Sequence, residues 1–149
     1  MMFQIPKSLK SEHESLHTTL LRAGKEKGEL GQCAQVLSKL LHPHMLREET
    51  LAFPLLGLLR QLAAGTVNAE MAEAIAAGER LRSEAASMAE EHRLIGEALK
   101  QLLALAGAED RTEYADFAYQ LIEHIRVEEE VLYPAALLVG DYVRLKLGR

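Results

Sequence analysis

The sequence predicts an all-α protein: a four-helix bundle in up-down-up-down order, built from two repeated helical hairpins. Three observations support this fold. Leu, Ala and Glu, which favour helices, dominate the chain, and β-branched residues are scarce. Only 10 glycines and 4 prolines occur in 149 residues, so the connections should be short and the helices antiparallel. With 48% hydrophobic residues, the chain can bury the core of one domain spanning residues 1–149.

The individual helices follow from apolar residues at helical spacing, with glycine and proline marking the ends. Pro43 should kink the second helix or remove one of its backbone hydrogen bonds. Pro54 and Pro134 should interrupt the second and fourth helices, leaving a short helical extension after each. Asn68 is a good N-cap for the third helix. The expected helical segments are 7–24, 30–53, 55–65, 69–106, 111–133 and 135–149.

Charge and composition exclude several classes of protein. The net charge is −5 and no basic cluster occurs, which disfavours nucleic-acid binding. The longest apolar runs are far shorter than the roughly 20 residues of a membrane helix, and the first residues do not resemble a signal peptide. The single cysteine, Cys33, cannot form an internal disulfide and suits a reducing compartment. We therefore expect a soluble cytoplasmic protein that does not bind membranes.

The chain contains an internal repeat. The stretch HMLREETLAFP at 44–54 returns as HIRVEEEVLYP at 124–134, an offset of 80 residues. Upstream, EHESLHTTL from Glu12 aligns with EHRLIGEAL from Glu91 at an offset of 79 residues. The first two helices therefore echo the next two. Each hairpin carries one histidine on its first helix and His-x-x-x-Glu on its second.

Helical phase places polar residues of this repeat on the apolar stripes. At about 100° per residue, Phe117 and Val131 lie within about 20° of His124, and Glu128 lies about 40° from it. The second helix repeats this arrangement, and the histidines of the EH pairs also fall among apolar neighbours. The residues expected in the bundle interior are His13, His44, Glu48, His92, His124 and Glu128.

Two buried carboxylates need a compensating positive charge, because burying an ionised carboxylate alone is very costly. No lysine or arginine lies near Glu48 or Glu128 on the same stripe. A pair of metal ions would compensate directly, since imidazole and carboxylate are ligands of iron, manganese and zinc. His and Glu four residues apart can reach one metal, and the two glutamates would face each other and could bridge two metals. The alternative is a set of hydrogen-bonded core histidines, which the doubled pattern disfavours.

The remaining polar and aromatic residues of the repeat have simpler expected roles. Glu12 and Glu91 should lie at the surface. Glu49 and Glu129, about 140° from the histidine direction, should be solvated, although either would replace its neighbour as ligand if the helix phase drifts near proline. The aromatic residues before the prolines, Phe53 and Tyr133, should pack the end of the bundle.

The sequence resembles the hemerythrin-like, or HHE cation-binding, domains. The matching motifs are EH at 12–13 and 91–92 and H-x-x-x-E-E at 44–49 and 124–129, followed by FP and YP. The resemblance covers about 9–134 and implies a four-helix bundle with a non-haem centre of two iron ions, rather than manganese or zinc. It implies His13, His44, His92 and His124 as terminal ligands, Glu48 and Glu128 as bridges, and an exogenous oxo, hydroxo or water bridge.

One position departs from the oxygen-carrying hemerythrins. Those proteins have a second histidine four residues after the one on the third helix, where this chain has Gly96. The repeat equivalent of Gly96 is His17, so our hypothesis is that His17 supplies a fifth histidine to the other metal. The alternative is that His17 is a polar edge residue and one metal keeps open positions beside Gly96.

Three classes of function stay open. The first is a di-iron protein that binds O2 or a related ligand such as NO for sensing, storage or delivery, and is not an enzyme. The second is a di-iron redox enzyme or an iron donor in repair of oxidative or nitrosative stress. The third is a metal-free or zinc-bound helical interaction module. The resemblance favours the first class. Residues 55–62 and the tail from 135 would cap the bundle or form a homodimer or other protein contact.

Overall fold

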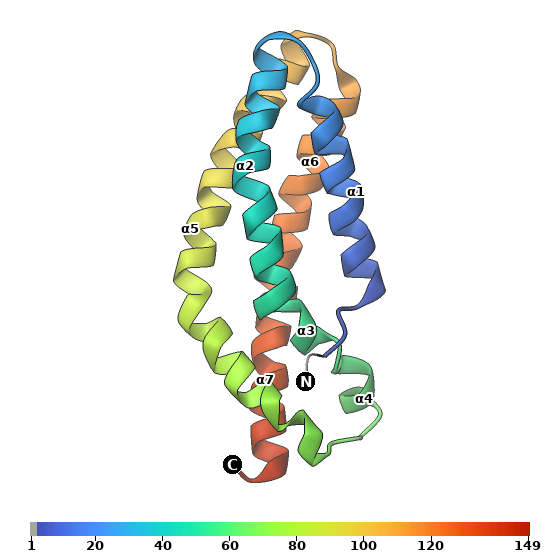
Figure 1. Cartoon of the computed structure of the whole chain (residues 1–149), viewed down its shortest axis with the longest axis vertical. Coiled ribbons are helices and arrows are strands. Elements are labelled where there is room, and N and C mark those ends of the chain that lie inside the picture. The colour runs from blue at the N-terminus through green and yellow to red at the C-terminus, as the bar shows by residue number, and fades with distance from the viewer. Residues whose placement is uncertain (1–2) are drawn as a thin grey trace.

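The structure is a computed structural model that describes residues 3–149, and every element in this part of the chain is helical (Figure 1). The predicted all-α class is confirmed. The elements are α1 (Lys7–Ala23), α2 (Gly28–Leu51), α3 (Phe53–Leu56), α4 (Leu59–Ala63), the 3-10 turn η1 (Ala69–Ala72), α5 (Glu73–Ala108), α6 (Thr112–Val127), the π-helical turn η2 (Glu128–Leu132) and α7 (Tyr133–Leu147).

Four long helices surround the upper interior of the elongated molecule (Figure 1). α1 packs against α2 and α6, and α5 packs against α2 and α6. α5 is 36 residues long and continues past the others, as does the rod formed by α6, η2 and α7. The lower half is built where α5, α7 and α3 pack together. The molecule is therefore more than a plain four-helix bundle, because its lower half rests on these extensions.

The fourth helix continues through Pro134 instead of being interrupted there. In η2 the Tyr133 N–H donates to the Glu128 carbonyl, five residues back. Proline lacks a backbone N–H and is tolerated in the first turn of a helix. The wide turn ends at Leu132, two residues before Pro134, so the proline falls in the first turn of α7. A π-turn inside a helix commonly marks a functional site.

The other predicted boundaries differ by smaller amounts. α2 runs through Pro43 and ends at Leu51, and Pro54 lies in the first turn of the separate helix α3. The Asn68 side chain accepts a hydrogen bond of 3.1 Å from the Glu70 N–H, so Asn68 caps η1, which leads into α5.

The buried apolar residues form two separate clusters, one in the upper half and one in the lower half. Along α5, Ile95 belongs to the upper cluster and Met88 to the lower one, with buried His92 between them. Along the α6–α7 rod, Leu121 belongs to the upper cluster and Ala136 to the lower one. A layer of buried polar side chains therefore crosses the interior between the two clusters.

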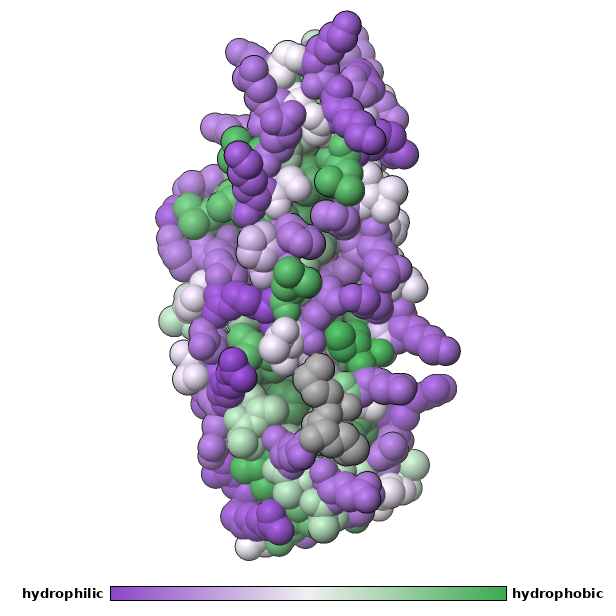
Figure 2. Space-filling model, in the orientation of Figure 1, coloured by the Kyte–Doolittle hydropathy of each residue, from purple (hydrophilic) through white to green (hydrophobic). Residues whose placement is uncertain are grey.

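The surface is dominated by hydrophilic residues on the face shown in Figure 2, where hydrophobic residues form small separate patches. None of the helices formed by residues 3–149 combines the length and the apolar character needed to cross a membrane.

Candidate metal centre

The polar layer consists of six buried side chains from five helical segments of the two repeats. None is more than 7% exposed. Their helices bring them together at one level of the bundle, because each lies on the inward face of its helix. They are His13 on α1, His44 and Glu48 on α2, His92 on α5, His124 on α6 and Glu128 in η2.

These side chains form two adjoining groups that could each hold a metal ion. In the first group, His44, Glu48, His92 and Glu128 each offer one ligand atom, and these atoms lie within 4.8 Å of one another. The second group meets the same limit and shares Glu128 with the first. Its members are His13, His124 and Glu128. The two groups are therefore adjacent and share one carboxylate.

The four histidines all direct Nε2 toward the two glutamates. Imidazole Nε2 and carboxylate oxygens are the atoms that bind iron, manganese or zinc. The distance from Nε2 to the nearest carboxylate oxygen is 2.9 Å for His124, 3.3 Å for His92, and 3.5 Å for His13 and His44.

Several of these inward atoms have no hydrogen-bond partner. Among the described residues, buried atoms without a partner include Nε2 of His13, His44 and His124, and Oε2 of Glu128. Although 2.9 Å separate His124 Nε2 from Glu128 Oε2, neither atom makes a hydrogen bond. A buried polar atom without a partner costs roughly 1–3 kcal/mol. A bound cation would satisfy these lone pairs, so the donor set fits a metal.

The other ring nitrogen of each histidine, Nδ1, meets a glutamate from a different helix. We call these four glutamates the outer carboxylates. A carboxylate at Nδ1 accepts a hydrogen bond from the ring N–H, which keeps the proton on Nδ1. The lone pair of Nε2 is then free to bind a metal. The pairs are His13 with Glu49 at 3.1 Å, His44 with Glu91 at 2.7 Å, His92 with Glu129 at 2.8 Å, and His124 with Glu12.

The role of the outer carboxylates does not follow from the sequence pattern, which places them at the surface or in solvent. The side chains of Glu12, Glu91 and Glu129 are 50%, 30% and 52% exposed, whereas that of Glu49 is only 13% exposed. A residue about 140° from the inward direction of a bundle helix can face the neighbouring helix instead of solvent. The repeat itself carried the signal, because both halves duplicate these glutamates together with the histidines.

Burial and mutual proximity shift the pKa values of the two inner glutamates in opposite directions. Burial, followed by the adjacent Glu128, raises the pKa of Glu48 well above its usual range. Burial by itself would also raise the pKa of Glu128, but contacts with Glu48 and His124 outweigh it and lower that pKa. Ionising both carboxylates side by side in the buried layer is therefore unfavourable, and a bound cation would offset their negative charge.

The histidines differ in their electrostatics. Burial lowers the pKa of His44, which favours the neutral ring that a metal requires. Burial acts in the same direction on His92 and His124, but their contacts with Glu128 outweigh it and raise both pKa values.

Tyr133 takes part in the polar layer, which the sequence analysis did not foresee. Its hydroxyl donates to Glu48 and lies 3.3 Å from His92 Nε2, and its ring stacks on that of His92 with centroids 5.6 Å apart. Phe53, its repeat equivalent, is fully buried, and its ring lies 4.9 Å from that of His13. Only the tyrosine can add an oxygen to the site.

His17 lies outside both groups. Its ring centroid is 5.1 Å from that of His42, and the two rings line a surface hollow together with Lys39. A side chain at Gly96, the repeat equivalent of His17, would meet nothing within 4 Å at its Cβ. The arrangement leaves open space at Gly96, one helical turn after His92.

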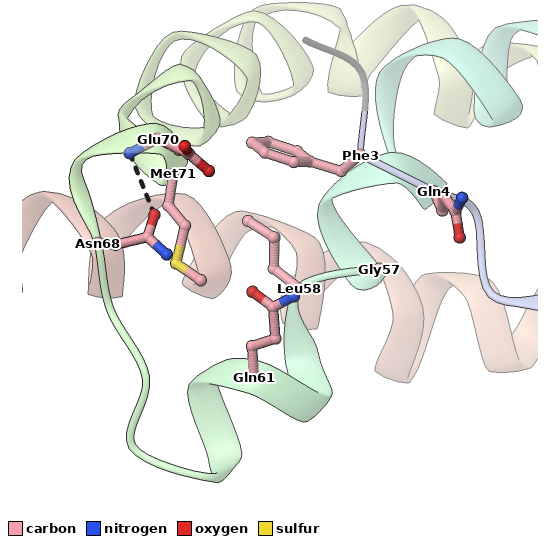
Figure 3. A pocket seen from close by; sticks show the side chains of 8 residues that line it. All are labelled: Phe3, Gln4, Gly57, Leu58, Gln61, Asn68, Glu70 and Met71. Carbon is pink, nitrogen blue, oxygen red and sulfur yellow. Dashed lines mark hydrogen bonds between the residues drawn. The ribbon is translucent and has the colours of Figure 1, made fainter.

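A second hollow lies at the lower end of the molecule, away from the polar layer (Figure 3). In Figure 3 the Asn68 side chain is engaged with the Glu70 backbone and the Phe3 ring extends into the hollow. Its lining offers one carboxylate and no histidine, so it does not resemble the metal centre. The lining residues are Phe3, Gln4, Gly57, Leu58, Gln61, Asn68, Glu70 and Met71.

Comparison with known proteins gives the same reading as the geometry. The family described as "Hemerythrin HHE cation binding domain" matches residues 4–136. Searches of curated proteins and of solved structures gave no match. The matched range contains the inner ligand candidates, the outer carboxylates and Tyr133. The chain therefore belongs to the hemerythrin HHE cation-binding domain family.

Proposed function

We propose that this protein is a non-haem di-iron protein that binds O2, or a related small ligand such as NO, for sensing, storage or delivery. The cation-binding family and the histidine–glutamate groups support the metal site. Iron as the metal, two ions per chain and the small ligand are our proposal. The ligands would be His13, His44, His92 and His124 at the two ends, with Glu48 and Glu128 between the ions.

The observation that carries this proposal is the set of partnerless inward atoms. Buried polar atoms in proteins are nearly always satisfied, yet three histidine nitrogens and one carboxylate oxygen here are not. At the same time, each histidine is oriented by an outer carboxylate. The outer carboxylates hold the four rings with Nε2 turned inward, and three of these Nε2 atoms have no hydrogen-bond partner. This arrangement favours a bound cation over a hydrogen-bonded core. Reversible binding of O2 or NO is the chemistry that a pair of irons would supply.

The surroundings suit a small ligand. Apolar clusters close the polar layer above and below, and these clusters keep bulk water away from the inner glutamates. The open space at Gly96 lies one turn from His92 and would give a small molecule room beside the site. We propose a location in the cytoplasm, on the ground that the single cysteine, Cys33, is free and buried.

The open space at Gly96 also favours a second candidate function, a di-iron redox enzyme or iron donor, because metal-based chemistry needs an exchangeable position. A sensor would in addition need a protein partner or a homodimer contact. A zinc-bound or metal-free interaction module is the third candidate, and in its metal-free form the orientation of the four histidines would have no role.

The test is metal analysis of the purified protein with absorption spectra taken before and after reduction and exposure to air. Two irons per chain, with bands that change reversibly with O2, would support the proposal. Two irons whose bands change irreversibly would favour redox chemistry. A chain without iron that is stable to a chelator would refute the metal site.

A further inference from the structure

The two halves of the metal centre are related by the internal repeat, which makes their differences informative. Each inner histidine, inner glutamate and outer carboxylate of one half has its counterpart in the other. The aromatic residue before the proline breaks this symmetry. It is Phe53 in the first half and Tyr133 in the second.

The phenol oxygen of Tyr133 lies among atoms of the first group. Its hydroxyl donates to Glu48 Oε2 and is 3.3 Å from Nε2 of His92. Both of these atoms belong to residues that would bind one cation. A cation held by Nε2 of His92 and a carboxylate oxygen of Glu48 would therefore have the phenol oxygen within reach.

The position of Tyr133 is fixed from two sides. Its ring stacks nearly parallel to the His92 ring, at an interplanar angle of 13°, with the hydroxyl 3.3 Å from Nε2. Its backbone N–H closes the π-turn η2 by bonding to the Glu128 carbonyl. The same turn that places one inner glutamate thus places the tyrosine.

We propose that Tyr133 is an additional protein ligand of the cation bound by His44, His92, Glu48 and Glu128. Tyrosine oxygen is a known ligand of iron in proteins. On binding, the phenol O–H bond is replaced by an oxygen–metal bond and the proton is released to solvent, as for any ligand that must deprotonate. The inference rests on the proposed metal site and adds a residue to it.

The consequence is a centre with two unequal metal positions. The position near His44 and His92 gains an anionic oxygen ligand. The position near His13 and His124 faces Phe53, which has no ligand atom. The two positions would then differ in their number of protein donors, and the position near His13 and His124 would have fewer of them.

The experiment compares the wild-type protein with Tyr133→Phe and with Tyr114→Phe. Tyr114 is the matched control, because it is a buried tyrosine whose hydroxyl donates to Glu26, at the opposite end of the upper cluster. Each protein is loaded anaerobically with ferrous iron and oxidised with ferricyanide. Its iron content, visible absorption and resonance Raman spectrum are then measured.

We expect two irons per chain in all three proteins. Wild type and Tyr114→Phe should show a visible charge-transfer band and enhanced tyrosine ring vibrations, and Tyr133→Phe should lose both. In wild-type protein carrying ring-deuterated tyrosine, the frequencies of these vibrations should shift. This shift tests for a tyrosine ligand even if Tyr133→Phe does not fold.

Wild type with two irons and no tyrosine vibrations would overturn the ligand role and leave Tyr133 as a hydrogen-bond donor to Glu48. Retention of the vibrations in Tyr133→Phe would overturn it as well. Wild type without bound iron would overturn this inference together with the proposed function, and the iron content distinguishes that result from the other two.

Discussion

Replacing each outer carboxylate by its amide should weaken metal binding in a graded order. A glutamine in place of Glu49 keeps a hydrogen-bond acceptor near His13 Nδ1 but removes the negative charge that makes the ring a better ligand. Loss of such a partner typically costs 10- to 100-fold in metal affinity, which is about 1.4–2.8 kcal/mol.

The expected order follows the burial of the four carboxylates. The Glu49 side chain is 13% exposed and that of Glu91 30%, so water screens their charges least. Glu12 and Glu129 are about half exposed, at 50% and 52%, and solvent screening should reduce their effects to about tenfold or less. We therefore expect Glu49→Gln to be the most damaging and Glu12→Gln and Glu129→Gln the least.

The assay is competition for ferrous iron between each variant and a chromophoric chelator under anaerobic conditions. Glu90→Gln is the matched control, because Glu90 precedes Glu91 on α5 but pairs with Arg93 at the surface. Lys10→Met tests whether the ion pair between Lys10 and Glu49 contributes by itself. Equal losses in Glu90→Gln and Glu49→Gln, or an order opposite to burial, would refute the reasoning.

Three further predictions concern stability and the predicted fifth histidine. Gly31→Ala should lower the free energy of unfolding by about 1–3 kcal/mol, because the added Cβ would lie 1.8 Å from the Glu26 carbonyl oxygen. Gly107→Ala, whose added Cβ would meet nothing within 4 Å, should raise the free energy of unfolding by about 0.5–1 kcal/mol. Urea unfolding measures both changes. Hydrogen bonds from Arg111 and Tyr114 lower the pKa of Glu26 from 4.5 to about 2. This contribution is full above pH 4.5 and is lost as the pH falls through about 2, so the Tm advantage of wild type over Glu26→Gln should shrink in that window; a constant difference would contradict it. His17→Ala should keep its full metal content and spectrum, since His17 lies against His42; metal analysis showing a loss would restore His17 as a ligand candidate.

Helical periodicity was sufficient to predict the six buried polar residues. His44 and Glu48, for example, were placed by their phase against the leucines of the same helix, and both are buried. This works because the stripe of a bundle helix is defined by residues within two turns of one another. The all-α class followed from composition for the same local reason.

The contacts between helices could not be read from the sequence. Phase shows which face of a helix is inward, but it does not show which neighbour a flanking residue meets. The pairing of Glu91 with His44 and of Glu129 with His92 depends on how α5 lies against α2 and η2. The π-turn before Tyr133 leaves no mark on the apolar periodicity, so the direction of its hydroxyl was missed.

The division of the interior by the polar layer has a consequence for folding. The molecule has two apolar cores, and the helices that pass between them are joined at that level by histidines and glutamates. Without a cation, this layer contains partnerless buried atoms, so we expect each core to open as a separate cooperative unit. With bound cations, side chains from α1, α2, α5, α6 and η2 would be linked through the two groups that share Glu128. We therefore expect metal binding to determine whether the protein unfolds as one unit or as two.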